Sequence, residues 1–279
     1  RAVRCRRSAP VTAAPPTPDG ADGRRWLTVL AEAAAAVQDA LEGVADWGEA
    51  GTRAGQHHSD LAADAAAVEV LLGAGCGVLS EESGLHGPDR EVVVVVDPLD
   101  GSTNASRRVS WWATSLCAVD AAGPLAALVV DLRHGTRWSA LRGAGAERDG
   151  EPILPSGCAD LAEAIVGLNG VPAGHGGWAQ YRALGACALD LCAVADGTLD
   201  GFLDCTTDEL APWDYLGGVL VCREAGVAVG GAAGRGLVVL DHAARRIPVA
   251  GATAPVAEAL RRRHPAHGDL HGGSVTPSS

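Results

Sequence analysis

Two acidic residues follow a run of five Val and carry the clearest chemical signal in the chain. Asp97 and Asp100 stand three positions apart across a turn that contains Pro98. Hard divalent cations prefer oxygen ligands, mostly carboxylates. The two carboxylates and the Leu99 carbonyl can therefore point at one metal centre. Two such ions can clamp the attacking water and the leaving oxygen of a phosphate ester.

Acidic side chains from other parts of the chain are predicted at the ends of rigid elements. Asp64 is expected on a helix, Glu81 and Glu82 follow a short strand, and Asp214 stands at the start of a helix. Elements of this kind can bring their ends to one point in the folded chain. Buried carboxylates are costly without a partner, which favours a metal-binding role for these acids.

The residues after Asp100 suit a phosphate group. Gly101 permits backbone conformations that a side chain would obstruct. Ser102, Thr103 and Asn104 supply hydroxyl and backbone N–H groups, and N–H groups exposed at the start of a helix favour an anion. The sequence therefore predicts a phosphate site beside the metal ligands.

The elements that must position these residues follow from the spacing of the apolar side chains. Helical spacing predicts two helices before Asp97, at residues 24–47 and 60–72. The Val run at 92–96 predicts a strand buried on both faces. It is expected to end at Asp97, because Pro98 cannot continue a central strand. Further strands are predicted at 78–79, 115–119, 125–130 and 136–141, the last three as an antiparallel meander.

The second half of the chain mixes both types of element. Helices are predicted at 177–184, 189–195, 212–225 and 254–262. Strands are predicted at 164–168, 200–204, 227–229, 237–240 and 247–249. The polar, Pro-rich or low-periodicity ends at 1–23 and 265–279 are expected to be disordered tails.

Composition narrows the classes of function. The 279 residues carry a formal net charge of −12 and contain no Lys, so a nucleic-acid partner is not expected. No apolar run is long enough to span a membrane, and no membrane partner is expected. The eight Cys form no Cys-x-x-Cys pair and are expected to be reduced, in a cytoplasmic protein.

Three motifs, in order along the chain, resemble those of the inositol monophosphatase family. They are residues 81–83 (Glu-Glu-Ser), residues 97–104 (Asp-Pro-Leu-Asp-Gly-Ser-Thr-Asn) and residues 213–218 (Trp-Asp-Tyr-Leu-Gly-Gly), with Glu-Ala-Gly at 224–226. The resemblance implies a layered α-β-α-β-α fold of the α+β and α/β type. It also implies a catalytic domain at 24–264, with a metal-binding α+β half (about 24–150) and an α/β half (151–264).

The resemblance also implies metal ligands and two or three Mg²⁺ ions per site. Glu81 matches the ligand that helps to position the attacking water, and Ser102 stands where most members have Thr. The implied catalytic residues are Glu81, Asp97 and Ser102. The implied metal ligands are Glu81, Asp97, the Leu99 carbonyl, Asp100, Asp214 and, at a weaker outer site, Asp64. Hydrolysis would be direct, without a phosphoenzyme.

The substrate side of the site departs from the family pattern. The implied phosphate and substrate contacts are Asp100, Gly101, Ser102, Thr103, Cys187, Asp204 and Asp214. The family often has an aromatic residue where this chain has Ala105, and the loop at 204–209 is longer than in animal members. Arg53 alone can replace a basic residue that often precedes the first metal helix. These differences leave the substrate open.

The expected activity is Mg²⁺-dependent hydrolysis of a small phosphorylated polyol, with inositol 1-phosphate as the leading substrate. Fructose 1,6-bisphosphate, histidinol phosphate and 3′-phosphoadenosine 5′-phosphate are alternatives on the same scaffold. A binding-only regulatory relative would be expected to lose an acidic ligand, and none is lost here. The resemblance further implies a homodimer and inhibition by Li⁺.

Overall fold

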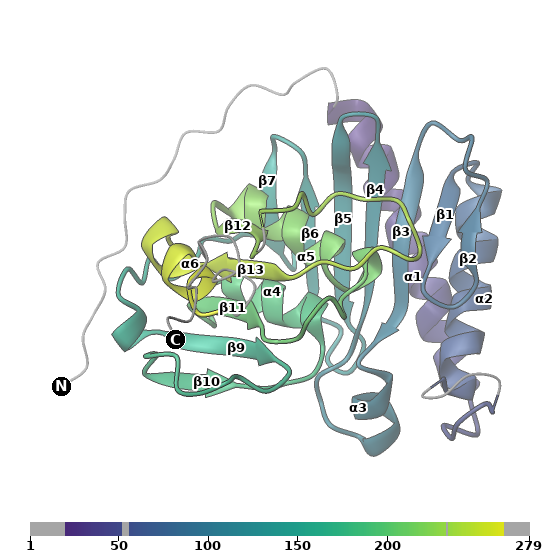
Figure 1. The fold of residues 1–279 in the computed structure, drawn as a ribbon. Coiled ribbons are helices and arrows are strands. Elements are labelled where there is room, and N and C mark those ends of the chain that lie inside the picture. Colours follow the sequence, from purple (N-terminus) through teal and green to yellow (C-terminus); the bar gives the residue numbers. More distant parts are fainter. Residues whose placement is uncertain (1–19, 52–55, 233, 265–279) are drawn as a thin grey trace, which may run out of the picture.

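The computed structural model describes residues 20–51, 56–232 and 234–264, which form five alternating layers of helices and sheets (Figure 1). Two helices cover the outer face of a large sheet, and two more lie between this sheet and a smaller one. A last helix packs on the smaller sheet. The predicted α-β-α-β-α fold is confirmed.

The larger sheet determines where the candidate site lies. In the described residues it has eight strands, in the spatial order β2 (Gly84–His86), β1 (Gly77–Ser80), β3 (Val93–Asp100), β4 (Ala113–Asp120), β5 (Gly123–Asp131), β6 (Arg137–Leu141), β7 (Gly145–Arg148) and β8 (Glu151–Pro152). The predicted meander is confirmed as β4, β5 and β6. β1 and β3 run parallel, so their carboxyl ends lie at one edge of the sheet.

Strand β3 is buried along its whole length, because its Val side chains alternate between two cores. Val94 and Val96 join the apolar cluster under the outer helices, and Val93 and Val95 join the central cluster. The prediction that this strand ends before Pro98 was wrong, since β3 continues to Asp100. Its pairing with β4 is irregular between Asp97 and Asp100, and such a bulge tolerates Pro.

The outer layer consists of α1 (Gly20–Glu42) and α2 (His58–Gly73). α1 packs on β4, β5 and β6, and α2 packs on β1 and β3. Their apolar faces supply Leu30, Val37 and Leu71 to the cluster beneath them. The first helix begins at Gly20, four residues before its predicted start, so residues 20–23 are helical and not part of a disordered tail.

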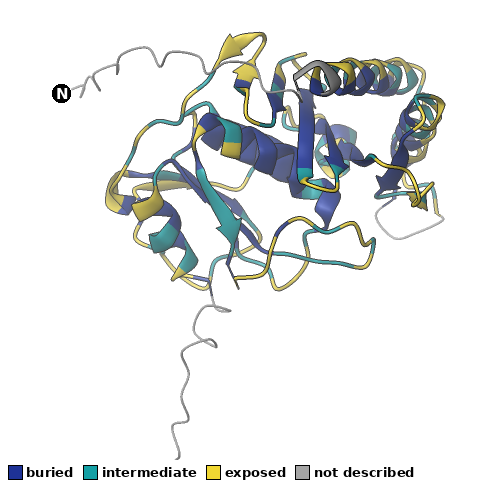
Figure 2. Cartoon of the chain, turned by 90° about the horizontal axis from the view of Figure 1, so that it is seen from above, coloured by how far each residue is buried: buried dark blue, intermediate teal, exposed yellow. Residues whose placement is uncertain are grey.

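The middle layer consists of α4 (Cys187–Ala195) and α5 (Pro212–Ala225), and both are almost entirely buried. The helix that runs through the centre of Figure 2 is mostly dark blue for this reason. Gly217 and Gly218 permit the close approach. A Cβ at Gly217 would lie 2.6 Å from Ser115 Oγ, and one at Gly218 would lie 2.6 Å from Leu191 Cβ.

The smaller sheet forms the fourth layer. In the described residues it has five strands, in the spatial order β10 (Gln180–Arg182), β9 (Ile165–Asn169), β11 (Gly201–Asp204), β13 (Pro248–Gly251) and β12 (Ala228–Gly231). Helix α6 (Ala254–Arg261) packs on β11, β12 and β13. Two short helices, α3 (Ser102–Arg107) and the 3₁₀ helix η1 (Leu161–Glu163), complete the fold.

Two predicted elements were wrong. Residues 177–184 do not form a helix: Gly177 has a φ of 89°, and the exposed strand β10 pairs in parallel with β9. Residues 237–240 do not form a strand but belong to an irregular segment, where the Leu237 carbonyl accepts a hydrogen bond from Tyr215 Oη at 2.9 Å. In both places tertiary contacts overrode a weak local pattern.

Some expectations concern residues outside the described ranges. The tails at 1–19 and 265–279, and Arg53, lie there. The described Cys residues are all free thiols, in agreement with the absence of a disulfide framework in the prediction.

Candidate active site

The exits of β1 and β3 bring the first two acidic motifs together. Ser80 pairs with Val96 across the parallel strands. The Glu81 backbone N–H donates to the Val96 carbonyl at 3.3 Å. Glu81 therefore lies beside Asp97 at the same edge of the sheet.

Asp97 is the most buried of the predicted central ligands, with 2% of its surface exposed. Its Oδ1 accepts a hydrogen bond from the Leu99 backbone N–H at 2.9 Å, which turns the chain back toward Asp100. Burial raises the pKa of Asp97 well above its usual value, and the charges of Glu81, Asp100 and Asp214 raise the pKa further. The four predicted ligands therefore act on one another electrostatically.

Asp100 connects the motif at residues 97–104 to the middle layer. Its Oδ2 accepts a hydrogen bond from the Ala188 backbone N–H, in the first turn of α4, at 2.8 Å. Burial raises the pKa of Asp100 to about 7, against the lowering effect of the Ala188 N–H and with a further increase from Glu81. The start of a second helix thus fixes the direction of this carboxylate.

Asp214 lies in the first turn of α5, directly after Trp213. Its Oδ2 accepts a hydrogen bond from the Ala211 backbone N–H at 2.5 Å, which caps the helix. Burial raises the pKa of Asp214 to about 7, Asp100 raises it further, and Arg245 acts in the opposite direction. Asp214 thus lies within electrostatic reach of Asp100.

The chemistry of these oxygen donors fits Mg²⁺, although the side chains are not arranged around one common point. Among the described residues, no three His, Cys, Asp or Glu side chains are arranged as a ready-made metal site. Each central carboxylate instead accepts a backbone N–H. All the donors are oxygens, which hard divalent cations prefer. Their pKa values are raised by burial and mutual repulsion, and a bound cation would relieve both effects.

Asp64 occupies a different position from the other predicted ligands. It is buried on α2, and its Oδ1 accepts a hydrogen bond from the Ser80 hydroxyl. Ser80 Oγ also accepts the Glu82 backbone N–H at 3.3 Å. Asp64 is not among the charges that raise the pKa of Asp97. The structure therefore links Asp64 to the exit of β1 through Ser80.

The predicted phosphate loop begins at a glycine that the fold requires. Gly101 has a φ of 85°, and a Cβ there would lie 3.1 Å from the Trp111 carbonyl oxygen and 3.2 Å from that of Gly185. Ser102 begins α3, and Thr103 is exposed. The following Asn104 donates from Nδ2 to the carbonyls of Trp111 at 2.8 Å and Leu184 at 2.7 Å. The loop is thereby held against the turn that leads into α4.

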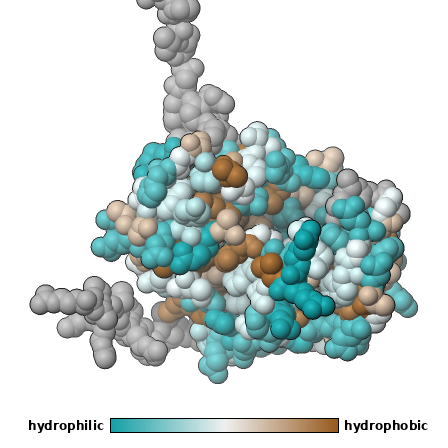
Figure 3. Space-filling model, turned by 90° about the horizontal axis from the view of Figure 1, so that it is seen from below, coloured by the Kyte–Doolittle hydropathy of each residue, from teal (hydrophilic) through white to brown (hydrophobic). Residues whose placement is uncertain are grey.

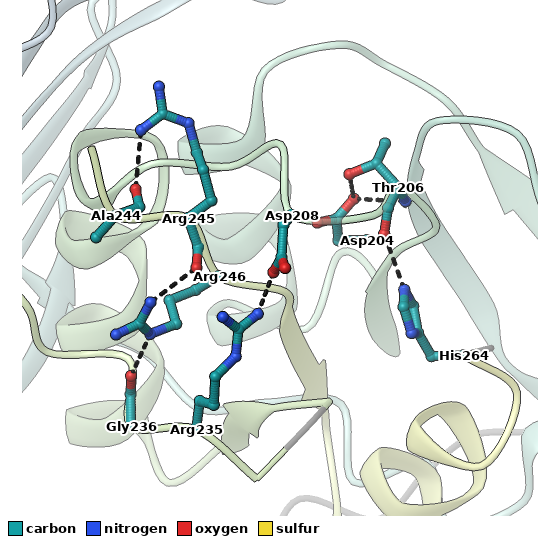
Figure 4. A network of polar contacts seen from close by, with 9 residues as sticks. All are labelled: Asp204, Thr206, Asp208, Arg235, Gly236, Ala244, Arg245, Arg246 and His264. Atoms are coloured by element: carbon teal, nitrogen blue, oxygen red, sulfur yellow. Dashed lines mark hydrogen bonds and ion pairs between the residues drawn. The ribbon is translucent and has the colours of Figure 1, made fainter. Parts of the chain in front are cut away.

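Two of the three predicted substrate contacts in the second half, Cys187 and Asp204, are buried. Cys187 begins α4, and burial, with Asp100 and Asp214, raises its pKa well above the usual value. Asp204 ends β11, where its Oδ1 accepts hydrogen bonds from Asn169 Nδ2 at 3.0 Å and Thr206 Oγ1 at 2.7 Å. Figure 4 shows Asp204 beside Thr206, whose carbonyl contacts His264. Within the described part of the chain, Asp204 Oδ2 is buried and has no hydrogen-bond partner.

Sequence reasoning missed Asp190, which lies in the first turn of α4. Its Oδ1 accepts a hydrogen bond from Trp111 Nε1 at 3.0 Å. Burial raises the pKa of Asp190 well above its usual value, and Asp100 raises it further. The available signal was an acid inside an otherwise apolar helix, which requires a buried partner.

Sequence reasoning also missed His242, because nothing local marks it. Its Nε2 lies 3.1 Å from the backbone carbonyl oxygen of Glu81, which is 161 positions earlier in the chain. Its ring packs on Trp213, with the ring centroids 4.7 Å apart. A contact over this separation cannot be read from spacing.

Known proteins have similar sequences and the same fold. Nus factor SuhB of Escherichia coli is 35% identical over 164 residues, which are 53% of this chain and 60% of the relative. The match thus spans less than two thirds of that relative. A fructose-1,6-bisphosphatase/inositol-1-monophosphatase of Archaeoglobus fulgidus is 32% identical over 216 residues, 74% of this chain and 84% of the relative. The structure of an inositol monophosphatase from Anabaena superposes with a TM-score of 0.72 at 25% identity, covering 87% of this chain and 96% of that one.

None of the helices in the described ranges combines the length and the apolar character needed to cross a bilayer.

The model of the inositol monophosphatase family matches residues 27–264, which include all three acidic motifs and their carboxylates. The chain therefore belongs to the inositol monophosphatase family.

Proposed function

We propose that this protein is a Mg²⁺-dependent phosphomonoesterase that hydrolyses a small phosphorylated polyol, with inositol 1-phosphate as the leading substrate. One observation carries the proposal. The acids of the first two motifs leave the larger sheet side by side, where the Glu81 backbone N–H donates to the Val96 carbonyl at 3.3 Å, and Glu81, Asp100 and Asp214 all raise the pKa of the buried Asp97. Such mutual repulsion is characteristic of functional sites.

We assign the ions to this centre. Glu81, Asp97, Asp100, Asp214 and the Leu99 carbonyl would hold them, and Asp64 would serve a weaker outer position. Bound Mg²⁺ would supply Lewis acidity, which activates water at neutral pH and offsets the charge that grows on the phosphoryl oxygens. The raised pKa values mean that protons and cations compete for Asp100 and Asp214 near neutral pH.

The protein groups would position the reactants. The Glu81 carboxylate and the Ser102 hydroxyl would orient the attacking water, and the Glu81 carboxylate would accept its proton. The backbone N–H groups of residues 101–103 would hold the phosphate. Asp204 would accept a hydrogen bond from a substrate hydroxyl through Oδ2, which has no hydrogen-bond partner among the described residues. As the water oxygen bonds to phosphorus, the P–O bond to the substrate oxygen would break, and that oxygen would take a proton from solvent water and leave as the alcohol on the side of Cys187 and Asp204.

The test is a panel of phosphate esters with Mg²⁺ present, ranked by kcat/KM. Inositol 1-phosphate should release phosphate, and Asp97→Asn should abolish the release at unchanged fold. The relative from Archaeoglobus fulgidus is named for activity on fructose 1,6-bisphosphate as well, so this ester is the second candidate. Histidinol phosphate and 3′-phosphoadenosine 5′-phosphate complete the panel. No release from any of the four would exclude the proposal and favour a binding role.

We also propose that the protein forms a homodimer and is inhibited by Li⁺, as the family resemblance implies. On the face shown in Figure 3, brown apolar residues occur in small groups among teal polar residues. A dimer interface on this face would therefore be of mixed character. Light scattering should give twice the mass of the chain, and Li⁺ should reduce Mg²⁺-dependent phosphate release. A monomeric mass, or activity insensitive to Li⁺, would contradict the respective proposal.

A further inference from the structure

The segment between β12 and β13 reaches from the smaller sheet to the candidate site. In Figure 1 this yellow-green chain leaves β12, passes in front of α5 toward β3 and returns to β13. We call its residues 235–246 the crossover segment. Figure 4 shows how it is anchored near its ends: Arg235 pairs with Asp208, and Arg246 Nε donates to the Gly236 carbonyl at 2.8 Å. The Arg246 backbone N–H also donates to the Leu210 carbonyl at 2.8 Å.

His242 is the contact between this segment and the first acidic motif. Its Nε2 lies 3.1 Å from the Glu81 backbone oxygen. A carbonyl oxygen can only accept a hydrogen bond, so Nε2 carries the proton. The Glu81 backbone N–H donates to the carbonyl of Val96, on β3, at 3.3 Å. The backbone of Glu81 is therefore bonded on both sides, by β3 and by His242.

The same imidazole contacts the second acidic motif. The rings of His242 and Trp213 are 4.7 Å apart at an angle of 41°. The guanidinium carbon of Arg245 lies 5.5 Å from the Trp213 ring, and Arg245 Nη1 donates to the His242 carbonyl at 2.9 Å. Trp213 is 4% exposed and immediately precedes Asp214. The ring of His242 is thus packed against the start of α5.

We propose that His242 is a positioning residue that fixes Glu81 and Asp214 relative to each other. These two acids lie on separate elements, the exit of β1 and the start of α5. One imidazole joins both elements, through its Nε2–H on Glu81 and its ring on Trp213. Groups behind metal ligands tune affinity in this way, and their loss costs about 10- to 100-fold. The inference rests on the proposed function, because Glu81 and Asp214 are ligands only in that proposal.

Two variants separate the hydrogen bond from the packing. His242→Phe keeps a ring against Trp213 and removes the donor, whereas His242→Gln keeps an N–H donor. His134→Phe is the matched control: His134 Nδ1 also has an oxygen partner, Asp131 Oδ2 at 2.8 Å, on the turn after β5. Mn²⁺ is titrated calorimetrically into the full chain and each variant, and thermal unfolding is measured without metal.

The expected result is a selective loss of ion affinity. His242→Phe should raise the Kd for Mn²⁺ about tenfold, while His242→Gln recovers most of this loss and His134→Phe has none. The metal-free Tm of His242→Phe should fall by about 2–4 °C at most. An unchanged Kd for His242→Phe would overturn the inference. Equal losses of affinity and Tm in both His242 variants would also overturn it, because the role would then be merely structural.

Phosphate release measured on the same samples separates the two proposals. Wild-type protein that binds Mn²⁺ but releases no phosphate would contradict the proposed function. The Mn²⁺ affinities of the His242 variants would then decide the role of His242 by themselves. Wild-type protein that hydrolyses phosphate esters, with His242→Phe binding Mn²⁺ equally well, would contradict the role of His242 alone. Wild-type protein without measurable Mn²⁺ binding would contradict both.

Discussion

The Asp100 carboxylate accepts a hydrogen bond from the Ala188 backbone N–H at 2.8 Å, although the two residues are 88 positions apart. The bond joins the end of β3 to the first turn of α4, and so connects the larger sheet to the middle layer. The bond uses the Oδ2 atom of Asp100, and in the proposed function the carboxylate would also bind a cation. The motif at residues 97–104 thus lies at the junction between the two layers.

Replacing Asp100 with Asn tests this division of labour. The amide oxygen of Asp100→Asn can still accept the Ala188 N–H, so the fold should survive, and near neutral pH the metal-free variant should be at least as stable as the wild type because it lacks the buried charge. Loss of the negative charge should reduce kcat/KM by at least about 100-fold, since groups behind metal ligands already cost 10- to 100-fold. Chemical denaturation and phosphate release check the two parts. Activity near the wild-type level would remove Asp100 from the ion site.

The stability of the metal-free protein should depend on pH in the direction set by the raised pKa of Asp100. Its folded pKa is about 7, above the usual unfolded value of about 4. The folded state therefore binds the proton more tightly, and between about pH 4 and 7 each unit of rising pH costs up to about 1.4 kcal/mol per group. In EDTA, Asp100→Asn should show a shallower fall of Tm from pH 5 to 7 than the wild type. Parallel Tm curves would contradict the raised pKa.

Gly101→Ala should damage the phosphate loop. The new Cβ would lie close to two backbone carbonyl oxygens, at 3.1 and 3.2 Å, in a left-handed conformation. Such strain costs about 1–3 kcal/mol, and the loop can relieve it only by moving Ser102. Gly143→Ala is the control, since Gly143 has a φ of 73° but nothing within 4 Å of its Cβ position. Both variants should lose stability, but only Gly101→Ala should lose kcat; equal kcat values would contradict the loop assignment.

Gly217→Ala should destabilise the contact between α5 and the larger sheet. Its Cβ would lie 2.6 Å from Ser115 Oγ and 3.2 Å from Val129 Cγ2, and overpacking of this kind costs about 1–3 kcal/mol. Gly73→Ala is the helical control, because Gly73 ends α2 with nothing within 4 Å. It should be neutral or stabilising by up to about 1 kcal/mol. Urea unfolding compares the pair, and equal midpoints would refute the close packing.

Asp204→Asn should affect substrate affinity more than turnover. Asp204 Oδ1 is occupied by Asn169 and Thr206, whereas Oδ2 is buried without a partner. If Oδ2 accepts a substrate hydroxyl, replacing it with an amide nitrogen should raise KM about tenfold or more and leave kcat nearly unchanged. A fall in kcat with constant KM would place Asp204 elsewhere in the reaction.

The sequence predicted the parts of the fold and site that have a local cause. The five Val before Asp97 can only form a strand buried on both faces, and Pro212 with an acid two residues later marks the start of α5. The acids were found because charge at the exit of a buried strand is costly without a function. The predicted fold and family are confirmed.

What the sequence did not predict depends on contacts between distant segments. β10 is an exposed strand that exists only because β9 pairs with it, and Leu237 lies in an irregular segment held by Tyr215. The roles of Asp190 and His242 require Trp111 and Glu81, which lie 79 and 161 positions away. Pattern and propensity contain no information about such pairs. The roles of the individual site residues, and the division into two halves, remain predictions.

The central claim is that acids from β1, β3 and α5 converge to hold divalent cations. Crystals grown with Mn²⁺ and measured for anomalous scattering test it most directly. We expect at least two anomalous peaks, one or more of them bounded by the carboxylates of Asp97, Asp100 and Asp214, and no such peak in Asp97→Asn. Crystals that contain millimolar Mn²⁺ but show no anomalous peak among these three carboxylates would contradict the account.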